Sequence, residues 1–290
     1  MGHGGYSLSS RRVRADSLGY ATKSTHEIFK SKSINNAMNP SGIVLRESCD
    51  SKEHPNSLAI MIGLDLTGSM GSVPHHLVKD DDGLPKIVSE IIENGEPDPQ
   101  ILFVGVGDHE CDNAPLQVGQ FESSDELMDK WLTDVYLEGG GGGNEGESYL
   151  LAWYFAGYHT KIDCFDKRNK KGFLFTIGDE PTLKKIPKSA VEKIMGEGQY
   201  ENFSAAQLLD KARERYNVYH LHIKQTGAGS RQETINGWKQ LMGDNLVVIE
   251  KHNDVAETIA KIVSEKTSKA EVETEVKEEK VEKEKRPKFL

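Results

Sequence analysis

Small oxygen-bearing side chains follow directly after an apolar run of the sequence, LAIMI at residues 58–62. Asp65, Thr67 and Ser69 lie in the next stretch, GLDLTGSMGS, which contains neither lysine nor arginine. Side chains at positions i, i+2 and i+4 of an extended or gently turning backbone point the same way, and Gly68 permits a tight turn. We therefore expect the oxygens of these three side chains to converge on one point.

A further carboxylate, Asp179, ends another apolar run, GFLFTIGD at residues 172–179. If both runs are parallel strands of one sheet, their carboxyl ends meet at the same edge, so Asp179 should reach the point at which Asp65 lies. Two carboxylates and two hydroxyls, completed by water, suit a hard divalent cation and not zinc, which favours histidine and cysteine. The sequence therefore predicts a site for Mg²⁺, with Mn²⁺ or Ca²⁺ as alternatives.

Five consecutive glycines, residues 139–143, precede a mostly apolar, helix-like segment. Each glycine loses much conformational freedom on folding, so the run needs a physical reason. Two explanations are open: a loop that approaches a ligand closely, or a flexible linker, and we favour the first because the run lies inside the predicted domain. A phosphate-binding loop is disfavoured because the stretch has no lysine, and Glu145 and Glu147 would repel phosphate.

Strand-like and helix-like segments alternate between residues 57 and 266. The strand-like runs are apolar over their whole length, as strands buried on both faces of a parallel sheet are. A weaker run at residues 115–121 comes directly before a helix without a crossover, and it predicts a short antiparallel edge strand. The alternation predicts an α/β fold, a doubly wound, mostly parallel sheet with helices on both faces. The strand-like runs are residues 58–65, 101–108, 172–179, 218–223 and 246–250, and the helix-like segments are residues 84–93, 124–135, 147–159, 204–216, 233–242 and 254–266.

Composition divides the chain into three parts. Residues 1–56 are rich in serine, glycine and asparagine, which predicts an irregular N-terminal arm, either disordered or laid along the domain surface. Residues 57–266 form the predicted α/β domain. Residues 267–290 hold seven acidic and seven basic side chains with little apolar mass, which predicts a charged, disordered C-terminal tail.

Charge, hydropathy and cysteine content limit the class of protein. The net charge of −10 argues against general binding of nucleic acids through phosphate contacts. No apolar run reaches the length of about 18 residues that a membrane-spanning helix needs, so we expect no contact with a membrane. Cys49, Cys111 and Cys164 are far apart and form no CxxC pair, which favours a reducing, cytoplasmic setting over a disulfide framework or a zinc site.

In their order and spacing, DLTGSM, the glycine-rich loop and TIGDEP resemble the motifs of the von Willebrand factor type A (vWA) domain. The resemblance extends over residues 57–266. It implies a metal-ion-dependent adhesion site whose ligands match the family motif at four positions, Asp65, Thr67, Ser69 and Asp179. Asn144 falls where the family usually has threonine. An amide oxygen can still bind a cation, and Glu145 or Glu147 is the alternative ligand.

The resemblance implies binding of a protein rather than catalysis. In such domains the cation keeps one coordination position open, and an acidic side chain of the partner fills it. Stand-alone bacterial and phage relatives inside the cell look like partners of MoxR-type AAA+ ATPases, which makes such an ATPase a candidate partner here. The prediction is a metal-dependent protein-binding module that is not an enzyme.

Two other functions are compatible with parts of this pattern. A structural component of a larger complex with a vestigial metal site is the main alternative. A metal-dependent phosphatase of the haloacid-dehalogenase type is a remote one, because it needs a second aspartate where this chain has Thr67. The GDHECD stretch, with Asp108 and Asp112, resembles a second ligand cluster, but we expect a solvated turn at the end of a strand.

Overall fold

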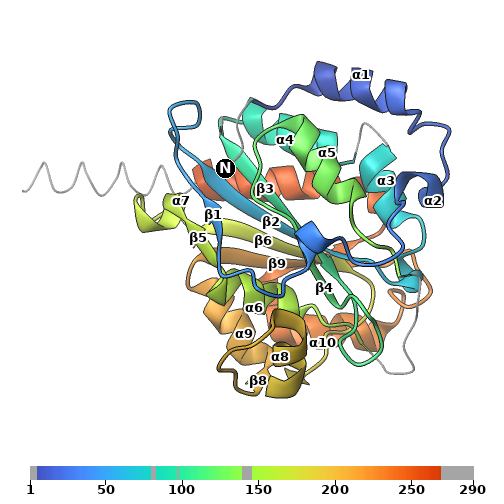
Figure 1. Ribbon diagram of the computed structural model, residues 1–290, viewed down its shortest axis with the longest axis vertical. Helices are drawn as coiled ribbons and strands as arrows, with labels where there is room; N and C mark the ends of the chain where they lie inside the picture. Colours follow the sequence, from blue (N-terminus) through green and yellow to red (C-terminus); the bar gives the residue numbers. More distant parts are fainter. Residues whose placement is uncertain (1–4, 80–82, 97, 139–145, 269–290) are drawn as a thin grey trace, which may run out of the picture.

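The computed structural model describes residues 5–79, 83–96, 98–138 and 146–268 of the chain. A six-stranded sheet forms its centre, in the order β10-β9-β6-β2-β3-β4 (Figure 1). All neighbouring strands are parallel except β3 and β4, which are antiparallel. The α/β fold and the antiparallel edge strand are therefore confirmed. The strands are β2 (Leu58–Asp65), β3 (Pro99–Val106), β4 (Leu116–Val118), β6 (Gly172–Gly178), β9 (Tyr216–Ile223) and β10 (Leu246–Ile249).

The central strands are apolar because both of their faces are covered. Every residue of β2, β3 and β6 is buried. Gly63 of β2 faces a helix so closely that an added Cβ would lie 3.4 Å from the Cβ of Ala152. This burial on both sides explains why the strands are continuous apolar runs rather than alternating ones.

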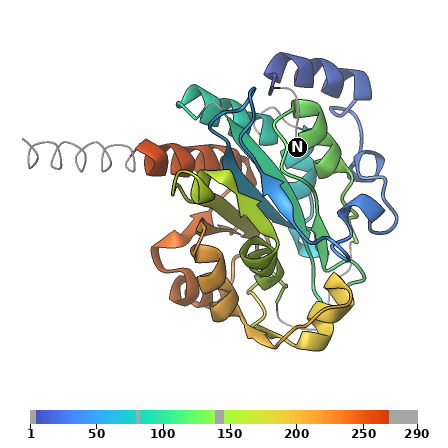
Figure 2. The same ribbon diagram turned by 60° about the vertical axis from the view of Figure 1, so that its left-hand side comes forward.

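Helices cover both faces of the sheet (Figures 1 and 2). One face carries α6, α9 and α10, and the other carries α3, α4, α5 and a helix at residues 255–268. On the second face, Lys86 of α4 pairs with Glu257 at 3.2 Å, which joins α4 to the last helix. The bounds are α3 (Val73–Lys79), α4 (Leu84–Glu93), α5 (Asp125–Thr133), α6 (Leu150–Tyr158), α9 (Ala205–Arg213) and α10 (Gln232–Met242).

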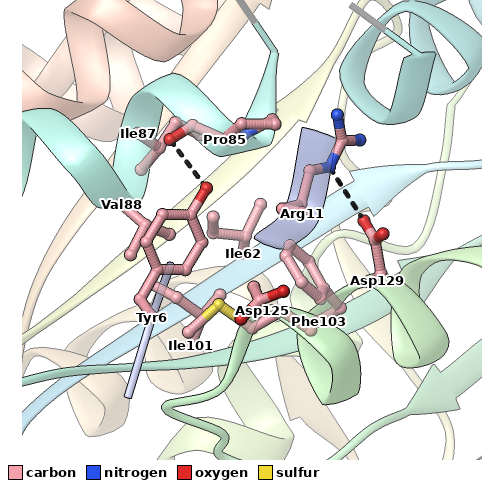
Figure 3. Close-up of a pocket in the computed structure, with 11 residues that line it drawn as sticks. Tyr6, Arg11, Ile62, Pro85, Ile87, Val88, Ile101, Phe103, Asp125 and Asp129 are labelled. Carbon is pink, nitrogen blue, oxygen red and sulfur yellow. Dashed lines mark hydrogen bonds and ion pairs between the residues drawn. The ribbon is translucent and has the colours of Figure 1, made fainter. Parts of the chain in front are cut away.

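The N-terminal arm contains a helix that the sequence pattern did not predict, α1 (Leu8–Leu18). It packs on α4 and α5, and Figure 3 shows how polar contacts fasten it. The Tyr6 hydroxyl donates to the carbonyl oxygen of Pro85 at 3.1 Å, and Arg11 Nε donates to Asp129 at 3.3 Å. Arg11 is only 2 % exposed, so α1 is held by a buried ion pair over a cavity of about 20 Å³.

Shorter elements complete the described chain. Within the arm, β1 (Arg46–Ser48) pairs in parallel with β5 (Thr160–Ile162), at the end of the helix that follows the glycine-rich loop. After β6 the chain forms a small unit of β7 (Lys185–Ile186), α8 (Lys188–Met195) and β8 (Phe203–Ser204). The remaining short helices are α2 (Thr25–Ile28) and α7 (Asp163–Asp166). Among the residues described, no helix is both long and apolar enough to cross a bilayer.

Candidate metal centre

The first and fourth strands of the main sheet in chain order, β2 and β6, lie side by side. Leu64 of β2 is opposite Ile177 of β6. From β2 the chain continues to β3 on one side of the sheet, whereas β6 leads to β9 on the other. This is the point at which the strand order reverses, and α/β sheets bind ligands outside the carboxyl ends of the strands there. Asp65 ends β2 at this point, and Asp179 follows directly after β6.

The predicted ligands that the structure describes form one chain of polar contacts. Thr67 donates to Asp65 Oδ1 twice, from its backbone N–H at 2.9 Å and from its hydroxyl at 2.6 Å. The hydroxyl oxygens of Thr67 and Ser69 are 3.1 Å apart. Ser69 in turn donates to Asp179 Oδ1 at 2.8 Å. The structure therefore brings Asp65, Thr67, Ser69 and Asp179 together from two strand ends.

The other predicted ligands belong to the glycine-rich loop. Asn144 and Glu145 lie outside the described residues, so their part in the site stays a prediction. Glu147 is described, and its backbone is tied to the segment after Asp179. The Glu147 N–H donates to the Pro181 carbonyl oxygen at 2.9 Å, and the Leu183 N–H donates to the Glu147 carbonyl oxygen at 2.9 Å.

Tyr149 is a site residue that the sequence reasoning missed. Its hydroxyl donates to Asp65 Oδ2 at 2.5 Å, and its side chain is fully buried. The hydroxyl occupies the space that a side chain at position 178 would need, because a Cβ built on Gly178 would lie 1.8 Å from it. The ring also packs edge-on against His220 and Trp238. Tyr149 thus holds the second oxygen of Asp65, while Thr67 holds the first.

Three buried carboxylate oxygens at this end of the sheet have no hydrogen-bond partner within the described residues. They are Asp179 Oδ2, Glu147 Oε2 and Asp108 Oδ2. Asp179 is 0 %, Asp108 1 % and Glu147 6 % exposed. Buried polar atoms are rarely left without a partner, and a proton, a water molecule or a bound cation would each supply one to these oxygens.

The closely spaced, buried carboxyl groups of the site favour binding of a cation. The pKa of Asp65 is raised to about 7, chiefly by burial and to a smaller extent by the charge of Asp179, against the opposing effect of hydrogen bonds from Thr67 and Tyr149. Burial together with nearby carboxylates, Asp65 first among them, raises the pKa of Glu147 to about 9. Within the described part of the chain, no lysine or arginine forms an ion pair with Asp65, Glu147 or Asp179.

The GDHECD stretch is the expected turn at the end of a strand, and Glu110 and Cys111 are exposed, but Asp108 is buried rather than solvated. Asp108 is buried, and Asp112 Oδ2 accepts from the Asp108 N–H at 2.7 Å, which folds the stretch back on itself. His109 is fixed to Ser148, with its backbone N–H 3.0 Å and its ring Nδ1 2.8 Å from the Ser148 hydroxyl. The expectation of a solvated turn therefore holds for Glu110 and Cys111 and is wrong for Asp108, which follows a strand that ends two residues earlier than expected.

The donor set fits a hard cation. Across the described ranges, no cluster of three or more His, Cys, Asp or Glu side chains has the arrangement of a metal centre. The site at Asp65 is of another kind, with two carboxylates and two hydroxyls, and water completes the shell of Mg²⁺ in such sites. Zinc would prefer imidazole or thiolate ligands, which this set does not offer.

Comparison with known proteins found similarity in three dimensions only. No protein-family model matches the sequence, and no curated protein sequence matches it. A pilus adhesin, SpaC from Lactobacillus rhamnosus GG, aligns over 75 % of this chain and 31 % of its own, at 10 % identity and a TM-score of 0.48. The mussel byssus protein PTMP1, in a structure with a zinc-occupied MIDAS motif, aligns over 75 % and 48 %, at 14 % identity and a TM-score of 0.41. The SpRpn10 VWA domain aligns over 69 % and 93 %, at 11 % identity and a TM-score of 0.41.

This chain spans about half of the mussel protein and about a third of the adhesin. With TM-scores below 0.5 and identities of 10–14 %, these similarities carry no information about the residues of the site.

Proposed function

We propose that this protein is a metal-dependent protein-binding module of the vWA kind. Its ligands for Mg²⁺, or for Mn²⁺ or Ca²⁺, would be Asp65, Thr67, Ser69 and Asp179, with Asn144 from the glycine-rich loop and Glu145 or Glu147 as the alternatives to Asn144. The observation that carries the proposal is the contact chain from Asp65 to Asp179, which ends in a buried carboxylate oxygen without a partner among the described residues.

Each side chain has a distinct part in the proposal. Thr67 and Ser69 present hydroxyl oxygens side by side, and Asp179 presents an unpaired oxygen next to them. Asp65 is held on both oxygens, by Thr67 and by Tyr149, so its carboxyl group keeps one orientation beside the hydroxyl of Thr67. A bound cation would supply the positive charge that an acidic side chain of the partner protein binds.

The same reasoning gives the class of partner. A single acidic side chain of a protein fits a site that exposes one cation, whereas general binding of nucleic acids needs many lysines and arginines to neutralise phosphates, and the chain has a net charge of −10. A MoxR-type AAA+ ATPase is the candidate partner that the resemblance to vWA domains supplies, in the cytoplasm of a bacterium or in a phage-infected cell. The proposal assigns no enzymatic reaction to the site.

The alternative is a structural component of a larger complex whose metal site no longer binds. Thermal unfolding with Mg²⁺, Mn²⁺ or a chelator separates the two. At a cation concentration a hundredfold above Kd, binding adds about 2.7 kcal/mol to the free energy of unfolding. We expect this gain in the wild type and not in Thr67→Val, which keeps the shape of the side chain and removes its hydroxyl. Equal melting temperatures with and without cation would favour the structural role, and release of phosphate from an aryl phosphate would favour a phosphatase.

A further inference from the structure

A group of exposed lysines lies on the small unit that follows Asp179. Lys184, Lys185, Lys188 and Lys193 are exposed, and none of them forms an ion pair with another described residue. Residues 183–195 contain these four lysines against one acidic residue, Glu192, a net charge of +3 in a chain whose net charge is −10. We call these four residues the lysine strip.

The lysine strip adjoins the candidate metal centre. The lysine strip begins five positions after Asp179. The backbone of the intervening segment forms a parallel β-bridge, Glu147 with Thr182, to the residues that follow the glycine-rich loop. Figures 1 and 2 show α8 at the same end of the molecule as the carboxyl ends of β2 and β3. A positively charged segment therefore follows closely after a site that contains two carboxylates and two hydroxyls.

A cleft of about 240 Å³ lies between α8, the N-terminal arm and the loop after β3. Lys193 lines one wall and Pro40 of the arm another, while His109 of the lining contacts Ser148, the residue directly before Tyr149. The arm is held against α8, since the Gly42 N–H donates to the Met195 carbonyl oxygen at 3.1 Å. The rest of the lining is partly apolar, with Ile34, Ala114, Pro115, Leu116, Ala190 and Ile194, and partly polar, with Asn39, Ser41, Asn113 and the carboxyl group of Asp112.

We propose that this cleft and the lysine strip form the docking surface for an extended acidic segment of the partner protein. The inference rests on the proposed function, in that one carboxylate of the segment would bind the cation while further carboxylates meet the lysines. Lysine ammonium groups on flexible stems reach acidic side chains without fixed geometry, and such complementary charge guides binding and selects the partner. A peptide fits better than a phosphate backbone, because apolar side chains such as Leu116 and Ile194 line the cleft and can contact apolar side chains between the carboxylates of a peptide.

Fluorescence anisotropy of a labelled oligoglutamate peptide at low salt tests the proposal. The triple variant Lys184→Glu, Lys188→Glu, Lys193→Glu should bind the peptide at least about fivefold more weakly than the wild type, because both attraction and steering are lost. A matched control changes the same net charge on exposed lysines elsewhere, Lys52→Glu, Lys261→Glu, Lys266→Glu, and should bind within about twofold of the wild type. Circular dichroism of both variants verifies that each is folded.

Equal loss in the two triple variants, or no peptide binding by the wild type, would overturn the docking surface. Tighter binding of an oligothymidylate than of the peptide would overturn it as well. Repeating the titration with chelator separates this inference from the proposed function. If peptide binding depends on the lysine strip but not on the cation, the docking surface is supported and the proposed metal role is contradicted. If peptide binding depends on the cation but not on the lysine strip, the metal role is supported and the docking surface is contradicted.

Discussion

Ser69 donates a hydrogen bond of 2.8 Å to Asp179, although 110 positions separate the two residues in the sequence. The contact exists because β2 and β6 are neighbours in the sheet while β3 and β4 lie on the far side of β2. Ser69 stands just after the first of these strands and Asp179 just after the other. The doubly wound topology therefore builds the candidate metal centre, and the predictions below test its parts.

Tyr149→Phe removes the hydroxyl that holds Asp65 Oδ2. We expect the fold to persist, since the ring keeps its contacts with His220 and Trp238. Loss of a supporting hydrogen bond beside a metal ligand typically lowers metal affinity by about tenfold or more. Titration calorimetry with Mn²⁺ measures the change. Tyr158→Phe is the control, because Tyr158 is 44 % exposed and lies at the opposite end of α6 from Tyr149. An unchanged affinity in Tyr149→Phe would exclude a positioning role for this hydroxyl.

Gly178→Ala should destabilise the protein through a clash and not through backbone strain. The new Cβ would lie 1.8 Å from the Tyr149 hydroxyl, which must then leave Asp65. Overpacking of this kind costs about 1–3 kcal/mol of the free energy of unfolding. Gly237→Ala is the matched control: its Cβ would meet nothing within 4 Å on α10, so it should gain about 0.5–1 kcal/mol. Urea denaturation of both variants measures the two changes in the free energy of unfolding, which should have opposite signs. A Gly178→Ala variant as stable as the wild type would contradict the close contact between Gly178 and Tyr149.

The stability of the metal-free protein should fall as pH rises. The folded pKa of Asp65 is about 7 against an ordinary 3.8, so in this interval the folded state holds a proton that the unfolded state has released. Stability from this group is full below the ordinary pKa and is lost as pH rises toward the folded value, at about 1.4 kcal/mol per pH unit for each proton. Glu147 extends the loss toward pH 9.

Urea denaturation with chelator at several pH values measures this slope. Asp65→Asn should make the fall in the free energy of unfolding with pH less steep, because one titrating carboxyl group is removed. Added Mg²⁺ should also make it less steep, because the cation replaces the proton. A stability that rises with pH over the same interval would contradict the burial of these carboxyl groups. Ser72→Ala, on an exposed side chain, serves as the control.

Arg11→Ala should show that the N-terminal arm is part of the stable structure. The substitution leaves the Asp129 carboxylate, which is 8 % exposed, with Arg14 as its remaining cationic contact. Removing one partner of a buried ion pair costs about 3–5 kcal/mol, and the contact with Arg14 should place the loss at the lower end. Val13→Ala on the same helix, at a side chain that is 71 % exposed, should cost little. Equal melting temperatures of the two variants would argue that the arm does not stabilise the domain.

The sequence predicts a strand most accurately where both faces of that strand are buried in the sheet. The bounds of β2 match the prediction at both ends, because LAIMIGLD is continuous in apolar character up to Asp65. By contrast, β3 begins at Pro99 rather than at residue 101. Its second residue, Gln100, is polar, and its side chain is satisfied in the buried strand by a hydrogen bond from Ser48. A polar residue with a distant partner gives no periodic signal.

Helix α1 and the role of Tyr149 were not predicted, because both depend on polar contacts with residues that are distant in the sequence. Helix α1 buries Arg11 and Ala15 and has no apolar stripe, because its contact with α5 is an ion pair. Tyr149 looked like one more apolar residue of a buried helix, and its hydroxyl gains a role only when β2 and α6 pack together. Gly178, directly before Asp179, was the signal that could have indicated a close neighbour at that point.

Calorimetric titration of Mn²⁺ into the purified chain tests the central claim most directly. Asp65, Thr67, Ser69 and Asp179 should together provide a cation site in the wild type, and Thr67→Val and Asp179→Asn should each lose the binding heat while keeping the circular dichroism spectrum of the wild type. Binding of equal affinity in the wild type and both variants, or no binding in any of them, would contradict the account.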